Sequence, residues 1–413
     1  MTMSAEVTTD CWRPETRFAF RFFCTYVLVA WLPEVASALG MSGWSPLKDA
    51  IGHWVITYVL RLPEHSLLPP QPAGGTWLPT ALAALVFVLG SLVVALIWTA
   101  LDRARCAYSR LHAWMHLIAR FTLAYVLLGY GLGKVLPSQF GPPGFQLLFF
   151  SQQTAQLSPQ GLLWAFMGAS REYTVFAGLV ETVGALLLLP HRTATLGALI
   201  SVAAMTHVVI LNVAYDVVVK VLALQMLFIA VCLLAPDLPR LVNLLVLNRQ
   251  VLPRPIRPLF ANPRHARLAH IVGVLSAVWM VYSQYEIAEN GATRKGRAAQ
   301  IPLYGMWDVT ASTESIPWRR FVVPYEGTGL TISPSESAML FLVRVDASGK
   351  TLDLTPNTLS RTIKPGPAVR FRYEQPSPAD LVLHSESTGG VTHLRLVPTS
   401  AVPLVSHRHR WYW

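Results

Sequence analysis

Seven runs of about 20 apolar residues constrain this chain more than any other feature, because a helix needs that length to cross the hydrocarbon of a membrane. The runs occupy residues 18–39, 79–101, 112–136, 174–189, 193–213, 216–234 and 266–287. Of all residues, 53% are hydrophobic and only 13% are charged, whereas a soluble domain carries about 25% charged residues. The sequence therefore predicts an α-helical polytopic membrane protein with about seven spans.

The arginines between the runs predict an orientation, because cytoplasmic loops of membrane proteins are rich in Lys and Arg. Every second connection is basic, with Arg103, Arg105 and Arg110 after the second run, Arg192 after the fourth, and Arg240, Arg249, Arg254, Arg257, Arg264 and Arg267 after the sixth. The N-terminus is then cytoplasmic, and the C-terminal region lies outside the cytoplasm. The net charge of +11 reflects this topology, so we expect no nucleic-acid partner.

Two interpretations of the first run stay open. Ala36-Ser37-Ala38 resembles a signal-peptidase site, so the run is either cleaved or kept as an anchor. The outer connection that follows it contains residues 46–61, whose apolar residues share one helical face, as in an interfacial helix. Further along, Ser158 and Pro159 predict the first turn of a short helix.

Cysteines and histidines give little support for a metal or a dithiol site. The four cysteines, which are far apart and form no CxxC motif, are Cys11, Cys24, Cys106 and Cys232. His407 and His409 in the C-terminal tail would share one face of a strand, but no third ligand accompanies them. We therefore expect no metal.

A polar cluster is predicted at one depth of the membrane, towards the outer side. Ionisable residues inside a membrane usually face the interior of a helix bundle and mark function. Four consecutive runs contribute to the cluster, which comprises Tyr130, Lys134, Gln139, Glu181, His207, Asn212, Tyr215, Asp216 and Lys220. We expect Lys134 to lie within reach of Glu181 or Asp216. The alternative is purely structural, with Lys134 extending to the membrane surface and Lys220 pairing with Asp216 four residues away.

The C-terminal region changes to short alternating runs, separated by Pro, Gly, Ser and Asp every eight to twelve residues, as in an all-β domain. Gly305 and Trp307 resemble the GxW opening of lipocalin-like barrels, in which the Trp closes one end. The sequence thus predicts a lipocalin-like barrel after residue 302. Either the barrel holds an apolar ligand, or its own side chains fill it.

Four motifs resemble the DoxX-like family of bacterial membrane proteins, and in particular its longer members with an extra-membrane C-terminal domain. The motifs are YGLGK at 130–134, PSQFGPP at 137–143, AGLVETVGALLLL at 177–189 and NVAYDVVVK at 212–220. The resemblance implies a four-helix membrane core, a place in the bacterial inner membrane with the C-terminal domain periplasmic or extracellular, and links to quinone-coupled redox systems. The family's polar positions correspond to Lys134, Gln139, Glu181, Asn212, Asp216 and Lys220. The stretch PPQPAGGTW at 69–77 departs from the family pattern.

The predicted organisation has five parts: an N-terminal membrane region at 1–110, a DoxX-like core at 111–250, a basic loop and a seventh span at 251–288, a linker at 289–302, and a periplasmic barrel at 303–413. Three functions remain open. The first is a non-catalytic accessory of a redox or quinone-linked system, with quinone as cofactor and lipid or redox-complex subunits as partners. The second is lipid or apolar-ligand binding and transfer through the barrel. The third is a membrane enzyme with Lys134 and Glu181 as an acid–base pair, although no catalytic residue is identified.

Overall fold

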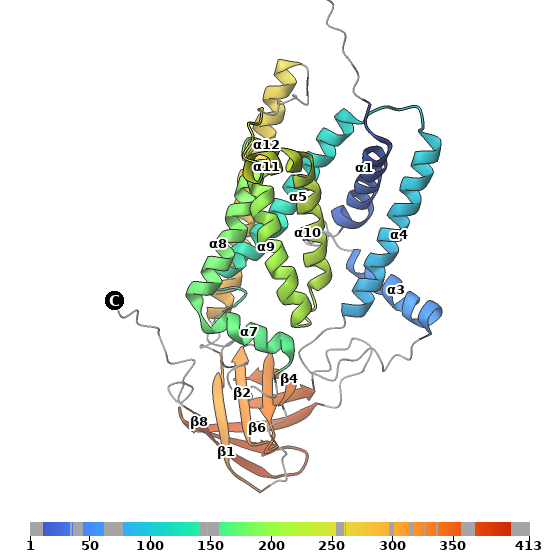
Figure 1. The fold of residues 1–413 in the computed structure, drawn as a ribbon. Helices are drawn as coiled ribbons and strands as arrows, with labels where there is room; N and C mark the ends of the chain where they lie inside the picture. The colour runs from blue at the N-terminus through green and yellow to red at the C-terminus, as the bar shows by residue number, and fades with distance from the viewer. Residues whose placement is uncertain are drawn as a thin grey trace, which may run out of the picture.

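The protein, seen here in a computed structural model, has a helical region with a β-barrel at one end of it (Figure 1). We call this end of the helical region the barrel end. The structure describes residues 11–33, 35, 44–61, 77–140, 147, 157–252, 260, 262–296, 301–313, 318–325, 327–335, 338–356 and 368–397. The proposed cleavage site at 36–38 and the histidines of the C-terminal tail lie outside these residues.

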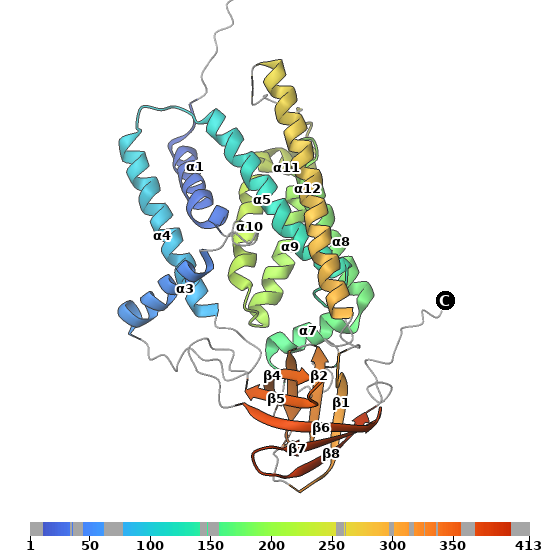
Figure 2. The same ribbon diagram turned by 180° about the vertical axis from the view of Figure 1, so that it is seen from behind.

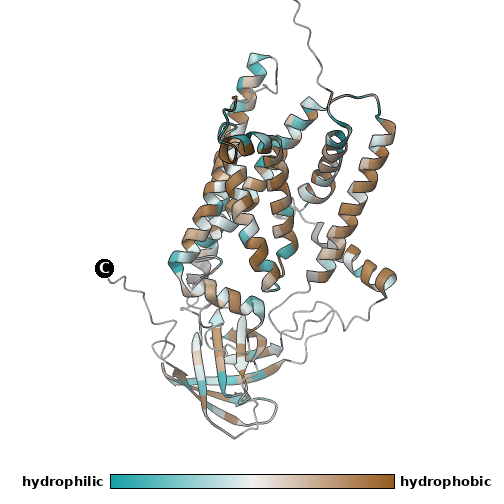
Figure 3. Cartoon of the chain, viewed as in Figure 1, coloured by the Kyte–Doolittle hydropathy of each residue, from teal (hydrophilic) through white to brown (hydrophobic). Residues whose placement is uncertain are grey.

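The helical region is built from long apolar helices that run between the barrel end and the opposite end (Figures 1 and 3). In chain order the helices of this region, long and short, are α1 (Pro14–Tyr26) with the π-helical turn η1 (Val27–Trp31), α3 (Trp44–Trp54) with η2 (Val55–Leu60), α4 (Trp77–Leu101), α5 (Ser109–Val135), α7 (Pro159–Ala169), α8 (Arg171–Leu188), α9 (Ala194–Ala214), α10 (Lys220–Leu234), the short η5 (Ala235–Asp237), α11 (Leu238–Leu245) and α12 (Pro263–Gly296). Within the described residues, five helices are long and apolar enough to cross a membrane: α4, α5, α9, α10 continued by α11, and α12.

These five helices coincide with five of the seven predicted runs, and the described residues of the first run and most of the fourth run are helical as well. The first run forms α1 and η1, and the fourth forms α8, which carries Arg171, Glu172 and Glu181 and is not among the five. Several boundaries differ from the prediction, among them that of the predicted linker. Residues 289–296, predicted as linker, continue α12 to Gly296, because this stretch contains no proline and the interior Gly291 weakens a helix without ending it.

Helix α5 lies at the centre of the helical region and packs against α8, α10 and α12. Figure 2 shows α12 along its rear face. Two polar side chains of α5 satisfy carbonyl groups at the ends of neighbouring helices, which lack partners inside their own helix. Arg120 donates to the Leu189 carbonyl at 2.8 Å, and His116 lies 3.3 Å from the Leu233 carbonyl. These contacts fix α8 and α10 to α5 at the end away from the barrel.

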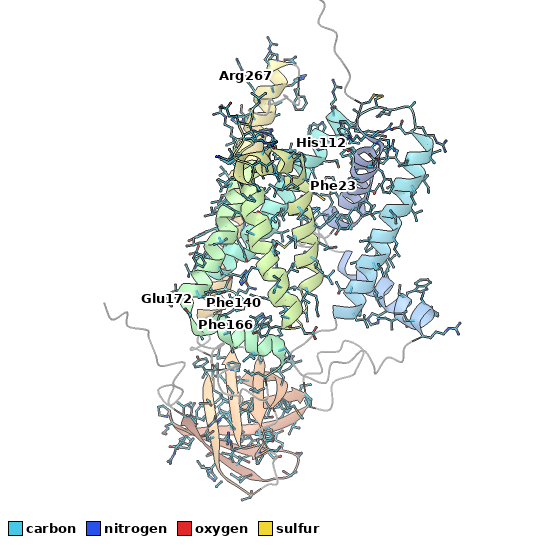
Figure 4. The ribbon with its side chains drawn as sticks, in the orientation of Figure 1. Phe23, His112, Phe140, Phe166, Glu172 and Arg267 are labelled. Carbon is cyan, nitrogen blue, oxygen red and sulfur yellow. A yellow bond between two sulfur atoms is a disulfide. The ribbon has the colours of Figure 1, made fainter. Side chains whose placement is uncertain are left out.

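At this opposite end, the N-terminus is tied to the connection between α4 and α5. Cys11 and Cys106 form a disulfide with Cα atoms 4.5 Å apart, and its sulfur atoms are drawn in Figure 4. The buried Arg21 donates to the Tyr108 hydroxyl at 2.8 Å and to the Asp102 carbonyl at 2.6 Å. This cysteine pair was not predicted, because 95 residues separate the two cysteines and only the antiparallel course of α1, α4 and α5 brings them together.

The C-terminal domain is a closed antiparallel barrel of eight strands in which each strand pairs with the next and β1 pairs with β8. Its strands are β1 (Gly305–Ser312), β2 (Arg320–Tyr325), β3 (Thr328–Ile332), β4 (Ala338–Asp346), β5 (Thr351–Pro356), β6 (Val369–Ser377), β7 (Asp380–Ser385) and β8 (Val391–Val397). The predicted all-β fold is confirmed. Successive side chains of a strand point to opposite faces of the sheet, so the alternating apolar and polar residues face the inside and the outside of the closed barrel.

Apolar side chains fill the described interior of the barrel. Trp307 is fully buried, and its indole N–H donates to the Leu303 carbonyl at 2.9 Å. Phe321, Leu352 and Leu383 are also fully buried and belong to the same apolar cluster. Of the two alternatives left open by the sequence, the described residues favour the filled barrel.

The outer face of β1, β2 and β3 packs on α7 at the foot of the helical region. Met306, Val322, Leu330 and Ile332 point away from the barrel interior and form one buried cluster with residues of the helical region, namely Phe140, Leu147, Leu163, Ala165, Met167 and Val217. The change from uniformly apolar runs to alternating runs in the sequence predicts a separate core for each domain. The barrel does have its own interior, but this shared cluster joins it to the helices.

We expect a fragment cut after Gly296 to fold alone, because the barrel closes around its own core. Circular dichroism should show strand signal and a cooperative melt. The fragment should also self-associate through the face that normally covers α7, and Leu330→Ser, which changes an outward-facing residue of this face, should reduce the association while preserving the melt. A spectrum of unstructured coil would contradict the prediction.

Candidate ligand-binding site

An ion pair between α5 and α8 forms the polar centre of the site. The Lys134 ammonium lies 2.7 Å from Glu181 Oε2 and 3.0 Å from Oε1. The side chains are only 10% and 4% exposed, respectively. Lys134 Nζ also lies 5.6 Å from the centroid of the Tyr130 ring, within the range of a cation–π contact. The sequence predicted a partner for Lys134, and the structure identifies it as Glu181.

Two glycines bring the helices close enough for this pair. A Cβ atom at Gly178 would lie 2.6 Å from the Gly131 carbonyl oxygen and 2.7 Å from Lys134 Cβ. A Cβ atom at Gly131 would lie 2.4 Å from Thr182 Oγ1. Lys134 and Glu181 each follow one of these glycines by three residues, which places them one turn further on the same helical face. The glycine contact therefore positions the ion pair.

A cavity of about 470 Å³ lies beside the ion pair, between α5, α7, α8, α9 and α10. Six of the nine predicted site residues line it: Tyr130, Lys134, Gln139, Glu181, His207 and Asn212. Figure 4 shows this part of the helical region, with Phe140 and Phe166 labelled near α7. The structure thus brings together polar residues from α5, α8 and α9, as the common depth of these residues predicted.

The three remaining predicted residues lie outside the cavity wall. Asp216 pairs with Lys220 four residues away, and neither they nor Tyr215 line the cavity. Asp216 is 62% exposed and has a φ of +52° in the turn between α9 and α10, a conformation that Asp adopts more readily than most residues. For this pair the alternative interpretation, a local ion pair, describes the structure.

Apolar side chains make up most of the cavity wall, and many of them had not been singled out from the sequence. Leu163, Trp164 and Met167 come from α7, and Leu222 and Met226 come from α10. Ser158 and Pro159 did predict the start of α7 from the sequence. In the structure, the Ser158 hydroxyl caps this helix and accepts a hydrogen bond from the Gly161 N–H at 3.0 Å. What the sequence could not show is that α7 lies under the four helices and closes the cavity.

The chemistry of the site suits a neutral molecule with one polar end. Lys134 and Glu181 neutralise each other, so an additional ion would enter without a counter-charge of its own. Beside this pair, Gln139 Oε1 is buried without a hydrogen-bond partner among the described residues. Within the same residues, no group of three or more His, Cys, Asp or Glu side chains could hold a metal ion. The site therefore offers a few polar groups at one end of an apolar cavity, the usual composition of a small-molecule site.

Long apolar helices, a terminal closed barrel and an enclosed ion pair beside an apolar cavity together define a helical membrane protein with a ligand-sized cavity. A stretch of 118 residues is 33% identical to the uncharacterized protein YwoB of Bacillus subtilis (strain 168), and the match covers 29% of this chain and 73% of YwoB. The chain belongs to the family of YwoB. No protein-family model matches the chain, and no solved structure matches it.

Proposed function

We propose that the protein binds a quinone-type molecule in its helical cavity and serves as a non-catalytic accessory of a quinone-linked redox system in the membrane. The observation that carries the proposal is the cavity of about 470 Å³ with Lys134 and Glu181 in its wall. This volume falls within the range of about 300–1,000 Å³ for sites of small molecules. The resemblance to the DoxX-like family supports the same assignment.

The hydrogen-bond donors of the cavity fit a quinone head group. A quinone is neutral and carries carbonyl oxygens, which accept hydrogen bonds but cannot donate them. The Lys134 ammonium has three N–H donors, of which Glu181 occupies two, and Asn212 and His207 supply further polar groups. When bound, the quinone would supply electron-transfer chemistry, while the protein would hold and orient the ring. The filled barrel argues against the alternative of ligand transfer through that domain.

Quinone binding tests the proposal directly. Purified full-length protein should bind a naphthoquinone in titration calorimetry, and the Lys134→Met, Glu181→Gln double variant should weaken binding about tenfold or more, equivalent to at least about 1.4 kcal/mol. Asp216→Asn is the matched control, because Asp216 is an exposed ion-pair residue outside the cavity. Failure of the wild-type protein to bind, with phospholipid as the tightly copurified ligand in native mass spectrometry, would favour lipid binding instead.

We further propose that the barrel lies outside the cytoplasm. The basic connections lie at the end of the helical region opposite the barrel, where Figure 4 labels Arg267, and cytoplasmic loops are enriched in such residues. A reporter that is active only in the cytoplasm should be silent when fused after Trp413 and active when fused to the N-terminus. The reverse pattern would overturn this orientation.

The Cys11–Cys106 pair provides an independent check on the orientation. It lies at the end that we assign to the cytoplasm, where thiols are kept reduced. We therefore expect an alkylating reagent added during cell lysis to label both cysteines, and the disulfide to form only after purification in air. Cys24, which is buried and free, serves as the internal control that needs denaturation for labelling. A disulfide already complete in the cell would contradict the assignment.

A further inference from the structure

Helix α8 is held against two different helices at its two ends. Near the barrel end, Gly178 packs against α5 at Gly131. Further from the barrel, α8 packs against α9, because a Cβ atom at Gly197 would lie 2.5 Å from the Leu188 nitrogen and one at Gly184 would lie 3.2 Å from Ser201 Oγ. Helices α8 and α9 therefore touch closely away from the barrel and separate towards it, as both ribbon views show (Figures 1 and 2).

The cavity reaches the outer surface of the helical region where α8 and α9 separate. On α9, the exposed residues Leu196, Ala203, His207 and Ile210 form one stripe at helical spacing, and Ala203 and His207 also line the cavity. On α8, Phe176 is 63% exposed and lines the cavity, whereas Leu179 and Val183 continue its exposed apolar face without lining the cavity. Residues that belong both to the outer surface and to the cavity wall mark a lateral opening.

The opening and the ion pair lie at different parts of the cavity. Lys134 and Glu181 are almost fully buried, whereas Phe176 is exposed on an apolar face that a membrane-spanning bundle turns towards lipid. A cavity of about 470 Å³ is near the lower end of the range for one drug-sized molecule. It therefore accommodates a ring-sized head group, but has no room for a long hydrocarbon tail in addition.

We propose that this opening, bounded by Phe176, Ala203 and His207, is a lateral portal through which a long-tailed membrane molecule inserts its head group and leaves its tail in the bilayer. The inference rests on the proposed function and extends it to a ligand class, the long-chain isoprenoid quinones. The neutral head reaches the Lys134–Glu181 pair, and the tail passes between α8 and α9. At the barrel end, α7 and the barrel cover the cavity. The head group therefore enters from the membrane and not from the water on that side.

Photocrosslinking in nanodiscs tests the portal in the full-length protein. The probe is an isoprenoid naphthoquinone with a diazirine in its tail, and a second probe carries the diazirine near the ring. Mass spectrometry should map the tail to the facing surfaces of α8 and α9 around Phe176 and Ala203, and the ring to residues near Glu181. An excess of unlabelled quinone should abolish both labels. Tail labelling on α7, the barrel or α12 would overturn the portal.

A pair of tryptophan variants adds a kinetic test. Ala203→Trp should slow ligand exchange about tenfold by narrowing the opening, since changes in affinity of related complexes reside mostly in dissociation rates. Leu196→Trp is the control, because Leu196 lies on the same exposed stripe outside the cavity. Equal exchange rates for both variants would overturn the portal but leave the proposed function intact. Absence of competable ring labelling in the wild-type protein would overturn the proposed function and the portal together.

Discussion

Lys134→Met is expected to destabilise the protein by about 3–5 kcal/mol, the usual cost of removing one partner from a buried ion pair. The loss arises because Glu181 would keep its charge in an environment where it is only 4% exposed. Combining Lys134→Met with Glu181→Gln should recover part of the loss, because the double variant leaves no uncompensated charge. Thermal unfolding of detergent-purified variants, analysed as a double-mutant cycle, measures this coupling.

A matched control cycle combines Lys134→Met with Asp216→Asn. The Asp216 side chain is 62% exposed and pairs with Lys220. Its effect should add to that of Lys134→Met without coupling, because the structure pairs Lys134 with Glu181 alone among the described acids. Additive losses with Glu181→Gln as well would mean that Lys134 reaches the membrane surface. The polar centre of the proposed site would then be absent.

Gly178→Ala is expected to have the second large effect, with a loss of about 1–3 kcal/mol from overpacking. The new Cβ atom would meet the Gly131 carbonyl oxygen at 2.6 Å, and backbone atoms of a packed helix cannot move aside independently. Helices α5 and α8 must therefore separate, which also lengthens the Lys134–Glu181 contact one turn away. We expect a lower melting temperature together with weaker naphthoquinone binding.

Gly90→Ala provides the control for this substitution. Gly90 also lies inside an apolar helix, α4, but apart from the adjacent backbone of its own helix no described atom lies within 4 Å of the position of its Cβ. The change should be neutral or stabilising, by up to about 1 kcal/mol, from the better helix propensity of Ala. A loss at Gly90 equal to that at Gly178 would show that glycine is needed in these helices for a reason other than close packing.

The helices and strands of this protein follow from local patterns in the sequence. Apolar runs of span length predicted the positions of α4, α5, α9, α10 and α12, and alternation with period two predicted the β-domain, because each pattern fits only one periodic backbone. Ser158 and Pro159 likewise predicted the start of α7. The common depth of Lys134, Glu181 and His207 followed from counting residues along each predicted helix.

Tertiary structure decided which of these groups meet. Lys134 had two acids at similar depth, and the close contact of Gly131 with Gly178 selects Glu181. The same packing forms a cavity where α8 and α9 separate towards the barrel end. The barrel, packed on α7, closes this cavity at that end. Such contacts depend on how helices cross and how domains dock. Residues far apart in the chain determine both, so no local pattern of the sequence encodes them.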